Sequence, residues 1–88
     1  MHTRVKLLKV KKWLVKDMTE KELGNRLRMY RTARRMTQVD LAKPLNMTRQ
    51  TVSTYETGSR IPDIYTLWAM ADIYNITIDE LIGRRTGS

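Results

Sequence analysis

The sequence predicts an all-α fold with five short helices between about residues 19 and 83. Three segments begin with a capping box, in which a Thr and an acidic residue three positions later bind each other's backbone amides. The boxes are Thr19–Glu22, Thr37–Asp40 and Thr77–Glu80. Apolar residues then recur at the three- to four-residue spacing of a helix face, and no segment of this range is typical of a strand.

The first predicted helix begins at the Thr19 cap and ends near Arg35. Leu23, Leu27 and Tyr30 follow each other at intervals of four and three residues, so they form one apolar stripe along it. The stripe predicts that this helix packs against the core through a single face.

The second predicted helix follows Thr37 and directs Leu41, Ala42 and Leu45 inward. Pro44 lies in its last turn and lacks a backbone donor, so we expect the helix to be shortened there.

A turn and a third helix come next. Asn46 suits the turn because Asn tolerates the left-handed conformation better than most residues. Thr48 caps the third helix, which carries Val52 and Tyr55 and ends at Gly58.

Two further helices follow an extended link at Ile61 and Pro62. Asp63 caps the fourth, and a left-handed Asn75 ends it. The last begins at its Thr77 box and ends at Gly83. The apolar residues of these helices are Ile64, Leu67, Trp68 and Ala71 in the fourth and Leu81 and Ile82 in the last. Met29, Met47 and Met70 are expected to fill gaps in the core.

The composition narrows the class of protein. Eighty-eight residues fit one domain, and the absence of Cys excludes disulfides and thiolate metal sites. His2 is the only histidine, so neither a metal site nor a bound cofactor is expected. No apolar run approaches the roughly 20 residues of a membrane span. These features predict a cytoplasmic protein without a membrane partner.

The net charge of +8 is unevenly distributed. Residues 1–18 carry six Lys or Arg against one Asp, residues 19–83 carry nine against eight acids, and Arg84 and Arg85 add two more positive charges. Such a polarised basic chain favours a polyanionic partner, with nucleic acid first and an anionic membrane surface second.

Residues 1–18 form a basic N-terminal arm that shows no clean helix or strand period. Three interpretations remain open: a frayed tail, an extended arm that reaches a polyanion, and an added element that packs on the domain or on a partner. Trp13, Leu14 and Val15 make it more apolar than a typical disordered tail. Residues 5–15 are therefore also a candidate site for a protein partner, while residues 84–88 form a short basic tail.

The second and third helices with their short turn have the helix-turn-helix arrangement. Residues 36–63, which read MTQVDLAKPLNMTRQTVSTYETGSRIPD, resemble the phage Cro/repressor-type (XRE-like) helix-turn-helix family. The likeness continues through residues 67–82 and covers about three-quarters of the chain. The resemblance implies a lambda-repressor-like DNA-binding domain over residues 19–83.

The family's functional positions can be transferred residue by residue. The positions matching base contacts are Arg49, Gln50, Thr51 and Thr54, and those matching phosphate contacts are Thr37 and Gln38. Three further phosphate contacts are expected outside the family pattern, from Ser53 and Thr57, which flank the base-contact positions, and from Arg35. Arg31 and Glu56 match a structural ion pair. Asn46 and Asn75 stand where the family often has glycine, and Arg35 stands where it often has a small residue.

The resemblance implies a sequence-specific transcriptional regulator that binds double-stranded DNA. The simplest form is a repressor that binds an inverted repeat as a homodimer. Its dimer face is expected near the last two helices, around Trp68, Tyr74, Ile76 and Ile78. An antitoxin-type protein-interaction module that represses its own operon is the alternative. No enzymatic activity is expected, because Ser53 has no histidine near it in the sequence to complete a catalytic triad.

Overall fold

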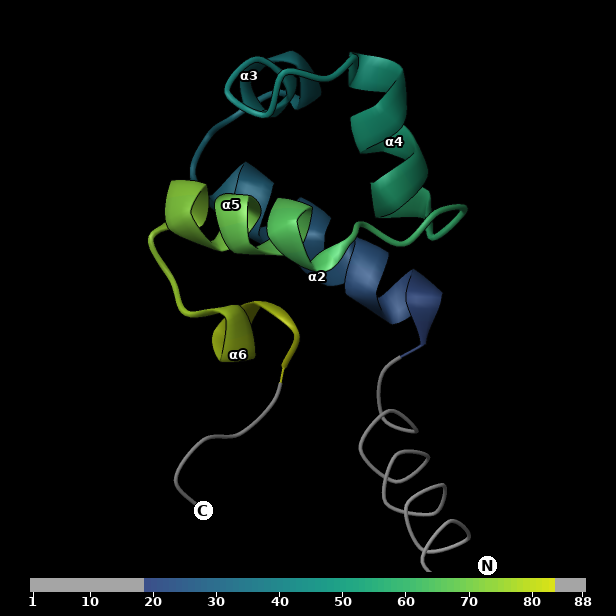
Figure 1. The fold of residues 1–88 in the computed structure, drawn as a ribbon, viewed down its shortest axis with the longest axis vertical. Helices are drawn as coiled ribbons and strands as arrows, with labels where there is room; N and C mark the ends of the chain where they lie inside the picture. The colour runs from purple at the N-terminus through teal and green to yellow at the C-terminus, as the bar shows by residue number, and fades with distance from the viewer. Residues whose placement is uncertain (1–18, 84–88) are drawn as a thin grey trace, which may run out of the picture.

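The computed structural model describes residues 19–83, and its five helices in that range confirm the predicted all-α class (Figure 1). The helices are α2 (Glu20–Ala33), α3 (Gln38–Ala42), α4 (Arg49–Thr57), α5 (Ile64–Tyr74) and α6 (Ile78–Leu81). No strand occurs between residues 19 and 83. The expectations for the arm of residues 1–18 and the tail of residues 84–88 lie outside the described residues.

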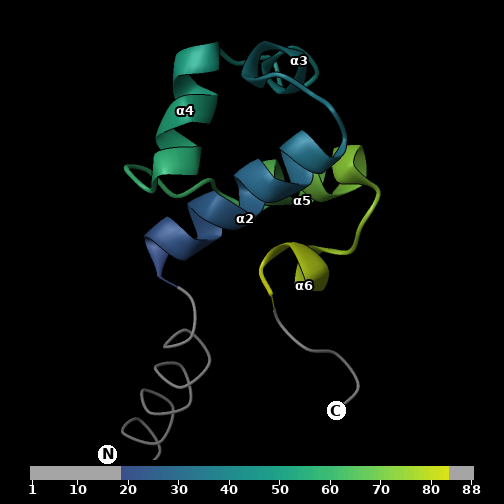
Figure 2. The same ribbon diagram turned by 180° about the vertical axis from the view of Figure 1, so that it is seen from behind.

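The helices stack in three tiers. Figures 1 and 2 show α3 and α4 at one end, α2 and α5 in the middle, and α6 at the other end. Helix α4 packs on α2 and α3, while α6 packs on α5 and α2. Because α2 contacts elements at both ends, it holds the helix-turn-helix pair to the rest of the domain.

The core is one cluster to which all five helices contribute. Its buried apolar members are Leu23, Leu27, Leu41, Ala42, Val52, Tyr55, Leu67, Met70, Ala71, Tyr74 and Leu81. Burying one large apolar side chain contributes about 1.5–3 kcal/mol. Tyr74 is fully buried and donates its hydroxyl to the Leu27 carbonyl at 3.2 Å, and its burial raises the pKa of this phenol.

Each helix begins at the predicted cap. The three capping boxes at Thr19, Thr37 and Thr77 are present in both directions. Thr48 and Asp63 cap α4 and α5 through their side chains. In the acidic partners, hydrogen bonds from backbone amides stabilise the carboxylate. The Thr37 amide therefore lowers the pKa of Asp40, as the Thr77 amide does for Glu80 and the Thr66 amide for Asp63.

The helix ends also follow the sequence. Asn46 and Asn75 adopt left-handed φ values of 54° and 58°, and Gly58 has φ of 83°. Helix α3 ends at Ala42, before Pro44, so the expected shortening is present.

The exposed face of α5 corrects the prediction for this helix. Ile64, one of the apolar residues expected to pack along this helix, is 56% exposed, and Trp68, which was also expected near a dimer face, is 61% exposed. Leu67, Met70, Ala71 and Tyr74 face the core instead. Helix α5 is apolar around most of its circumference, so the spacing of its residues could not identify the buried face.

The burial of Tyr74 and of Met29 also differs from what their spacing in the sequence predicted. Tyr74 is fully buried and is therefore excluded from any dimer face. Met29 is 51% exposed, because α2 turns this position to solvent, whereas Met70 fills the core as expected.

Arg26 of α2 and Arg34, the C-cap residue that follows α2, hold the ends of the C-terminal helices. Arg26 donates through Nε to the Leu81 carbonyl at 2.9 Å, and Arg34 donates through Nε to the Tyr74 carbonyl at 2.8 Å. Between them lies Tyr30, whose ring stacks on the Tyr74 ring with centroids 6.0 Å apart. Cations at helix C-termini bind orphan carbonyls and oppose the helix dipole.

Gly24 allows α2 and α4 to approach closely. A Cβ atom at this position would lie 2.4 Å from the Glu56 carbonyl oxygen and 2.7 Å from the Tyr55 carbonyl oxygen. Both clashing atoms belong to backbone, so a side chain here could be accommodated only by moving α4. A glycine inside a helix otherwise destabilises it relative to alanine, which indicates that packing requires this one.

We expect Gly24→Ala to destabilise the domain by about 3 kcal/mol, since overpacking against backbone outweighs the helix-propensity gain of about 1 kcal/mol. Urea denaturation followed by circular dichroism measures the change. Asn25→Ala, at the exposed neighbouring position, is the matched control and should leave stability nearly unchanged. A Gly24→Ala variant more stable than the parent chain would contradict the close contact.

Candidate nucleic-acid interface

The N-terminal ends of α3 and α4 lie together at one end of the domain. Gln38 is the first residue of α3, and Arg49 is the first residue of α4. The Arg49 guanidinium donates from Nη1 to the Gln38 Oε1 at 3.2 Å. Two of the predicted contact residues from separate helices are therefore directly joined.

Beneath this surface lies the ion pair between α2 and α4. Arg31 donates from Nε to Glu56 Oε2 at 2.6 Å and from Nη2 to Glu56 Oε1 at 3.0 Å. Both residues are buried, at 9% and 5% exposure, and the hydrogen bond that Arg31 donates to the Glu56 carboxylate raises the pKa of Arg31. A third donor of Arg31, Nη1, binds the Met36 carbonyl at 2.7 Å. The pair therefore positions both α4 and the chain entering α3.

Gln38 connects the buried pair to the surface. Its Nε2 donates to Glu56 Oε1 at 3.1 Å, while its Oε1 accepts from Arg49. These two partners fix which end of the amide faces which neighbour. Because an amide nitrogen carries two hydrogens, one N–H remains available to an external acceptor. The polar chain thus runs from Arg31 through Glu56 and Gln38 to Arg49.

The threonines of α4 use their hydroxyls within the protein. The Thr54 hydroxyl donates to the Thr51 carbonyl at 2.6 Å, and the Thr57 hydroxyl donates to the Thr54 carbonyl at 3.2 Å. The Thr51 hydroxyl lies 3.0 Å from that of the Thr48 cap. With these hydroxyls engaged, Thr51 and Thr54 can present their methyl groups outward. Gln50 is exposed and Ser53 is half-buried on the same helix.

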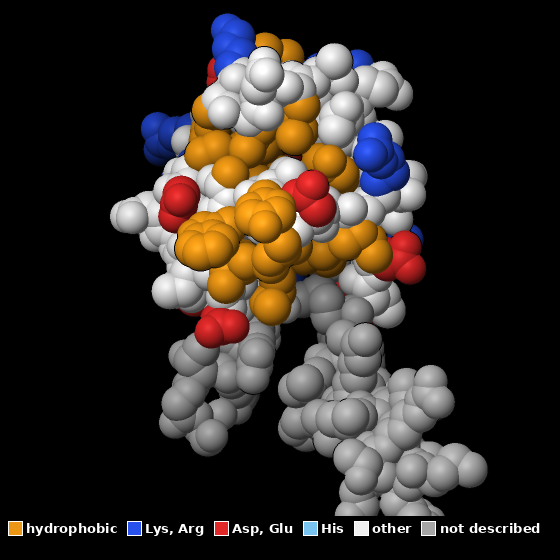
Figure 3. Space-filling model, viewed as in Figure 1, with side chains coloured by type: hydrophobic (Ala, Val, Ile, Leu, Met, Phe, Trp, Pro, Cys, Tyr) orange, Lys and Arg blue, Asp and Glu red, His pale blue; other side chains and the backbone are white. Residues whose placement is uncertain are grey.

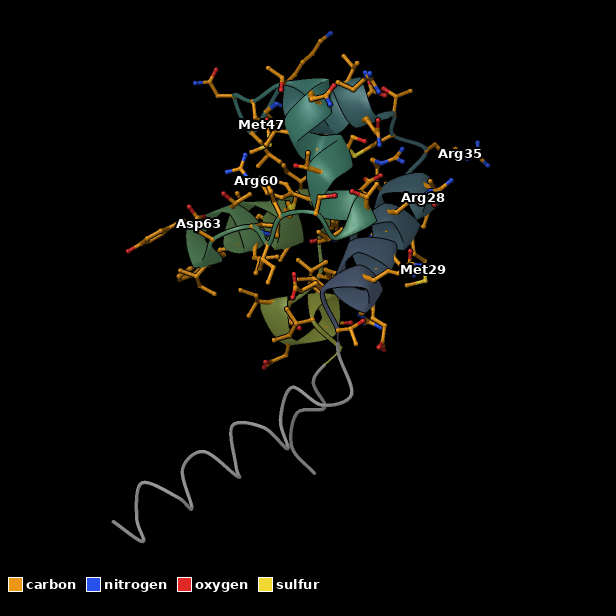
Figure 4. The ribbon with its side chains drawn as sticks, turned by 90° about the vertical axis from the view of Figure 1, so that its right-hand side faces the viewer. Arg28, Met29, Arg35, Met47, Arg60 and Asp63 are labelled. Atoms are coloured by element: carbon orange, nitrogen blue, oxygen red, sulfur yellow. The ribbon has the colours of Figure 1, made fainter. Side chains whose placement is uncertain are left out.

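Arg35 lies apart from this group. It has φ of 56°, and its amide donates to the Thr32 carbonyl while the Met36 amide donates to the Arg31 carbonyl, the arrangement of a Schellman motif. Its exposed side chain extends away from the domain, as does that of Arg28 (Figure 4). Among the described residues, no hydrogen bond joins Arg35 to the other predicted contact residues.

Comparison with known proteins decides the family. Residues 27–81 match the model of the family described as "Helix-turn-helix". The chain belongs to this Cro/repressor-type (XRE-like) family. The HTH-type transcriptional regulator ImmR of Bacillus subtilis is 37% identical over 62 residues, which are 70% of this chain and 49% of that protein.

Two other relatives agree with the assignment. The HTH-type transcriptional activator BcrR of Enterococcus faecalis is 33% identical over 61 residues, which are 69% of this chain and 30% of that protein. An uncharacterised HTH-type transcriptional regulator of Methanocaldococcus jannaschii is 33% identical over 59 residues, or 67% of this chain and 89% of that protein. The chain thus spans about half of ImmR and less than a third of BcrR.

Sequence reasoning missed two contacts beside this helix-turn-helix surface. The Gln38–Glu56 bond joins residues 18 positions apart, so no local pattern indicates it. Arg60 places its guanidinium 5.8 Å from the centroid of the Tyr55 ring, just after α4 ends (Figure 4). Its position two residues after Gly58 was the available signal, because a basic residue in the turn after the third helix remains near that helix.

Other kinds of site were also sought between residues 19 and 83. No group of three His, Asp or Glu side chains there is placed to hold a metal ion. None of the helices in this range is long and apolar enough to cross a membrane.

We expect Glu56→Ala to destabilise this helix-turn-helix domain by about 3–5 kcal/mol, because it leaves the buried Arg31 cation unpaired. Thermal and urea unfolding measure the loss. The double variant Arg31→Met with Glu56→Leu removes both charges and should recover most of the stability, which distinguishes an unpaired charge from lost packing. Unchanged melting and unchanged DNA binding in Glu56→Ala would refute the structural role of the pair.

Proposed function

We propose that this chain is a sequence-specific regulator of transcription that binds double-stranded DNA, with residues 19–83 as its DNA-binding domain. The observation that carries the proposal is the polar N-terminal end of α4, where Arg49 and Gln50 are exposed and Gln38 of α3 supports Arg49. In helix-turn-helix proteins the N-terminal residues of this second helix contact base edges in the major groove.

Each exposed residue of α4 has a chemistry suited to a base. Arg49 can donate to both O6 and N7 of guanine, and Gln50 can bind N6 and N7 of adenine. Thr51 and Thr54 use their hydroxyls within the protein, and their methyl groups suit contact with thymine methyls. A good bidentate contact discriminates against a wrong base by about 1–3 kcal/mol.

The surrounding polar residues suit phosphate contacts, which set the register of the protein on the duplex. Gln38 offers its remaining N–H, already oriented by Glu56. Thr37 precedes it at the start of α3, and Ser53 and Thr57 flank the base-reading residues on α4. Arg35, in the turn before α3, is a further proposed phosphate contact although it lies apart from these residues.

The proposed form is a homodimer that represses by occupying an inverted repeat. A single recognition helix contacts few base pairs, whereas two helices about 34 Å apart on a twofold axis read a palindrome. Ile76 and Ile78 are only half-buried beside α6 and are the proposed twofold contact. Tyr74, which is buried, takes no part.

Selection of bound duplexes from a random DNA pool tests the function. We expect an enriched inverted repeat with half-sites about one helical turn apart. Gln50→Ala should relax the preference at one base pair of each half-site, with a loss of about 1–3 kcal/mol on the selected site. Asn25→Ala, on the exposed surface of α2, is the control. Binding without any enriched sequence would overturn the proposal.

Arg35 allows its roles in folding and in DNA binding to be separated. Arg35→Gly should stabilise the domain by about 1 kcal/mol, because glycine adopts the left-handed conformation without steric cost. The same change should weaken DNA binding and reduce the slope of log K against log salt by about 0.9, the loss of one phosphate contact. Arg35→Asn, which also tolerates positive φ, should show the same loss of slope. An unchanged salt slope in both variants would exclude the phosphate contact.

A further inference from the structure

An apolar patch lies exposed on α5 and the link before it. It consists of Ile61, Ile64, Tyr65 and Trp68, which are 57%, 56%, 77% and 61% exposed. Figure 3 shows apolar side chains gathered over α5 on this face of the molecule. Exposed aliphatic and aromatic side chains in such a group mark a binding surface rather than scattered surface residues.

Acidic residues flank the α5 part of the apolar patch, while the exposed Arg60 directly precedes Ile61 and lies over the Tyr55 ring. Asp63 caps α5 directly before Ile64, and the exposed Asp72 lies one helical turn beyond Trp68. Residues 61–83 contain four Asp or Glu and no Lys or Arg. If two copies met patch to patch, each acidic rim would face its own duplicate, and like charges would repel. A basic and apolar occupant fits this surface better than a second copy of it.

The chain itself carries a segment of this chemistry. Residues 5–15, VKLLKVKKWLV, combine seven apolar residues with four lysines, and residues 1–18 as a whole have a net charge of +5. Its apolar side chains match the rings of Tyr65 and Trp68. Its lysines match the carboxylates at the rim and can also lie over the aromatic faces.

Residues 16–18, which connect residues 5–15 to α2, allow the segment to reach the apolar patch. At the start of α2, the Lys21 backbone lies against Gly58, since a Cβ atom built on Gly58 would be 3.0 Å from the Lys21 Cα. Ile61, the first residue of the apolar patch, is three positions beyond Gly58. A chain extends by up to about 3.6 Å per residue, so residues 16–18 provide a tether of about 10 Å. Residues 5–15 are thus within reach of the apolar patch of the same chain.

We propose that residues 5–15 pack on the apolar patch of their own chain. There they complete the domain on the face of α5 that no other described helix covers. The contact covers Tyr65 and Trp68 and neutralises part of the acidic surface of α5. Of the three interpretations of the arm of residues 1–18, this proposal corresponds to an added element that packs on the domain. The inference does not depend on DNA binding, and its test contains no DNA.

The chain contains only two tryptophans, so Trp13→Phe leaves Trp68 as the sole tryptophan reporter. Acrylamide quenching of Trp68 is then compared in the full-length chain with and without Lys11→Glu/Lys12→Glu. The matched control is Arg84→Glu/Arg85→Glu, which changes the net charge equally at the other end. A segment bound in more than half of the molecules lowers the quenching slope by about twofold relative to the released state.

We expect slow quenching in the parent and in the Arg84/Arg85 variant, faster quenching in the Lys11/Lys12 variant, and no change on dilution. Equal slopes in all three proteins would overturn the proposal and favour an arm that is free or reserved for DNA. Protection that disappears on dilution would also overturn it, because the occupant would then be a second copy. Equal far-ultraviolet circular dichroism over the helices in all three proteins ensures that the comparison reports the contact.

Discussion

The arrangement of this domain depends on the buried ion pair between Arg31 and Glu56. Taking two charges out of water costs several kcal/mol per ion, and the cost is offset only when the geometry satisfies both groups. Here the carboxylate accepts two bonds from Arg31 and one from Gln38, while Arg31 also binds the Met36 carbonyl. A displaced α4 would leave a charge unpaired. The pair therefore fixes geometry more than it adds net stability.

Gly24 and this pair act on the same contact from different sides. Gly24 removes the side chain that would separate α2 from the Glu56 carbonyl, and the resulting proximity lets Arg31 reach the Glu56 carboxylate. Through Gln38 the same network orients Arg49 at the surface. The surface formed by Gln38 and Arg49 is consequently held by buried residues and by α2, not by α3 and α4 alone. A preorganised surface of this kind loses less conformational entropy when a ligand binds.

The arginines of α2 and of its C-terminal end have three different roles: binding helix ends, forming the buried ion pair, and exposing charge to solvent. Arg26 of α2 and Arg34, which caps the C-terminal end of α2, bind the carbonyl ends of α6 and α5. Arg31 is buried, whereas Arg28 and Arg35 extend to solvent (Figure 4). A basic run in a sequence thus overstates the charge that is free for a polyanion. The exposed arginines and the acidic residues of α5 and α6 therefore give different parts of the fold opposite charge.

The sequence by itself determined the number of helices, their caps and their ends, because a capping box, a left-handed Asn and a helix period are local and involve residues within one or two turns. Through the family resemblance, it also indicated which residues of α3 and α4 match the family's DNA-contact positions. Tertiary structure decided which face of α5 is buried, which arginines of α2 are exposed, and why residue 24 is glycine. Each of these depends on atoms brought together from distant positions, such as Gly24 with Glu56 and Gln38 with Glu56. The spacing of residues along one helix carries no information about such contacts. Packing and charge pairing between helices decide which face of each helix is buried.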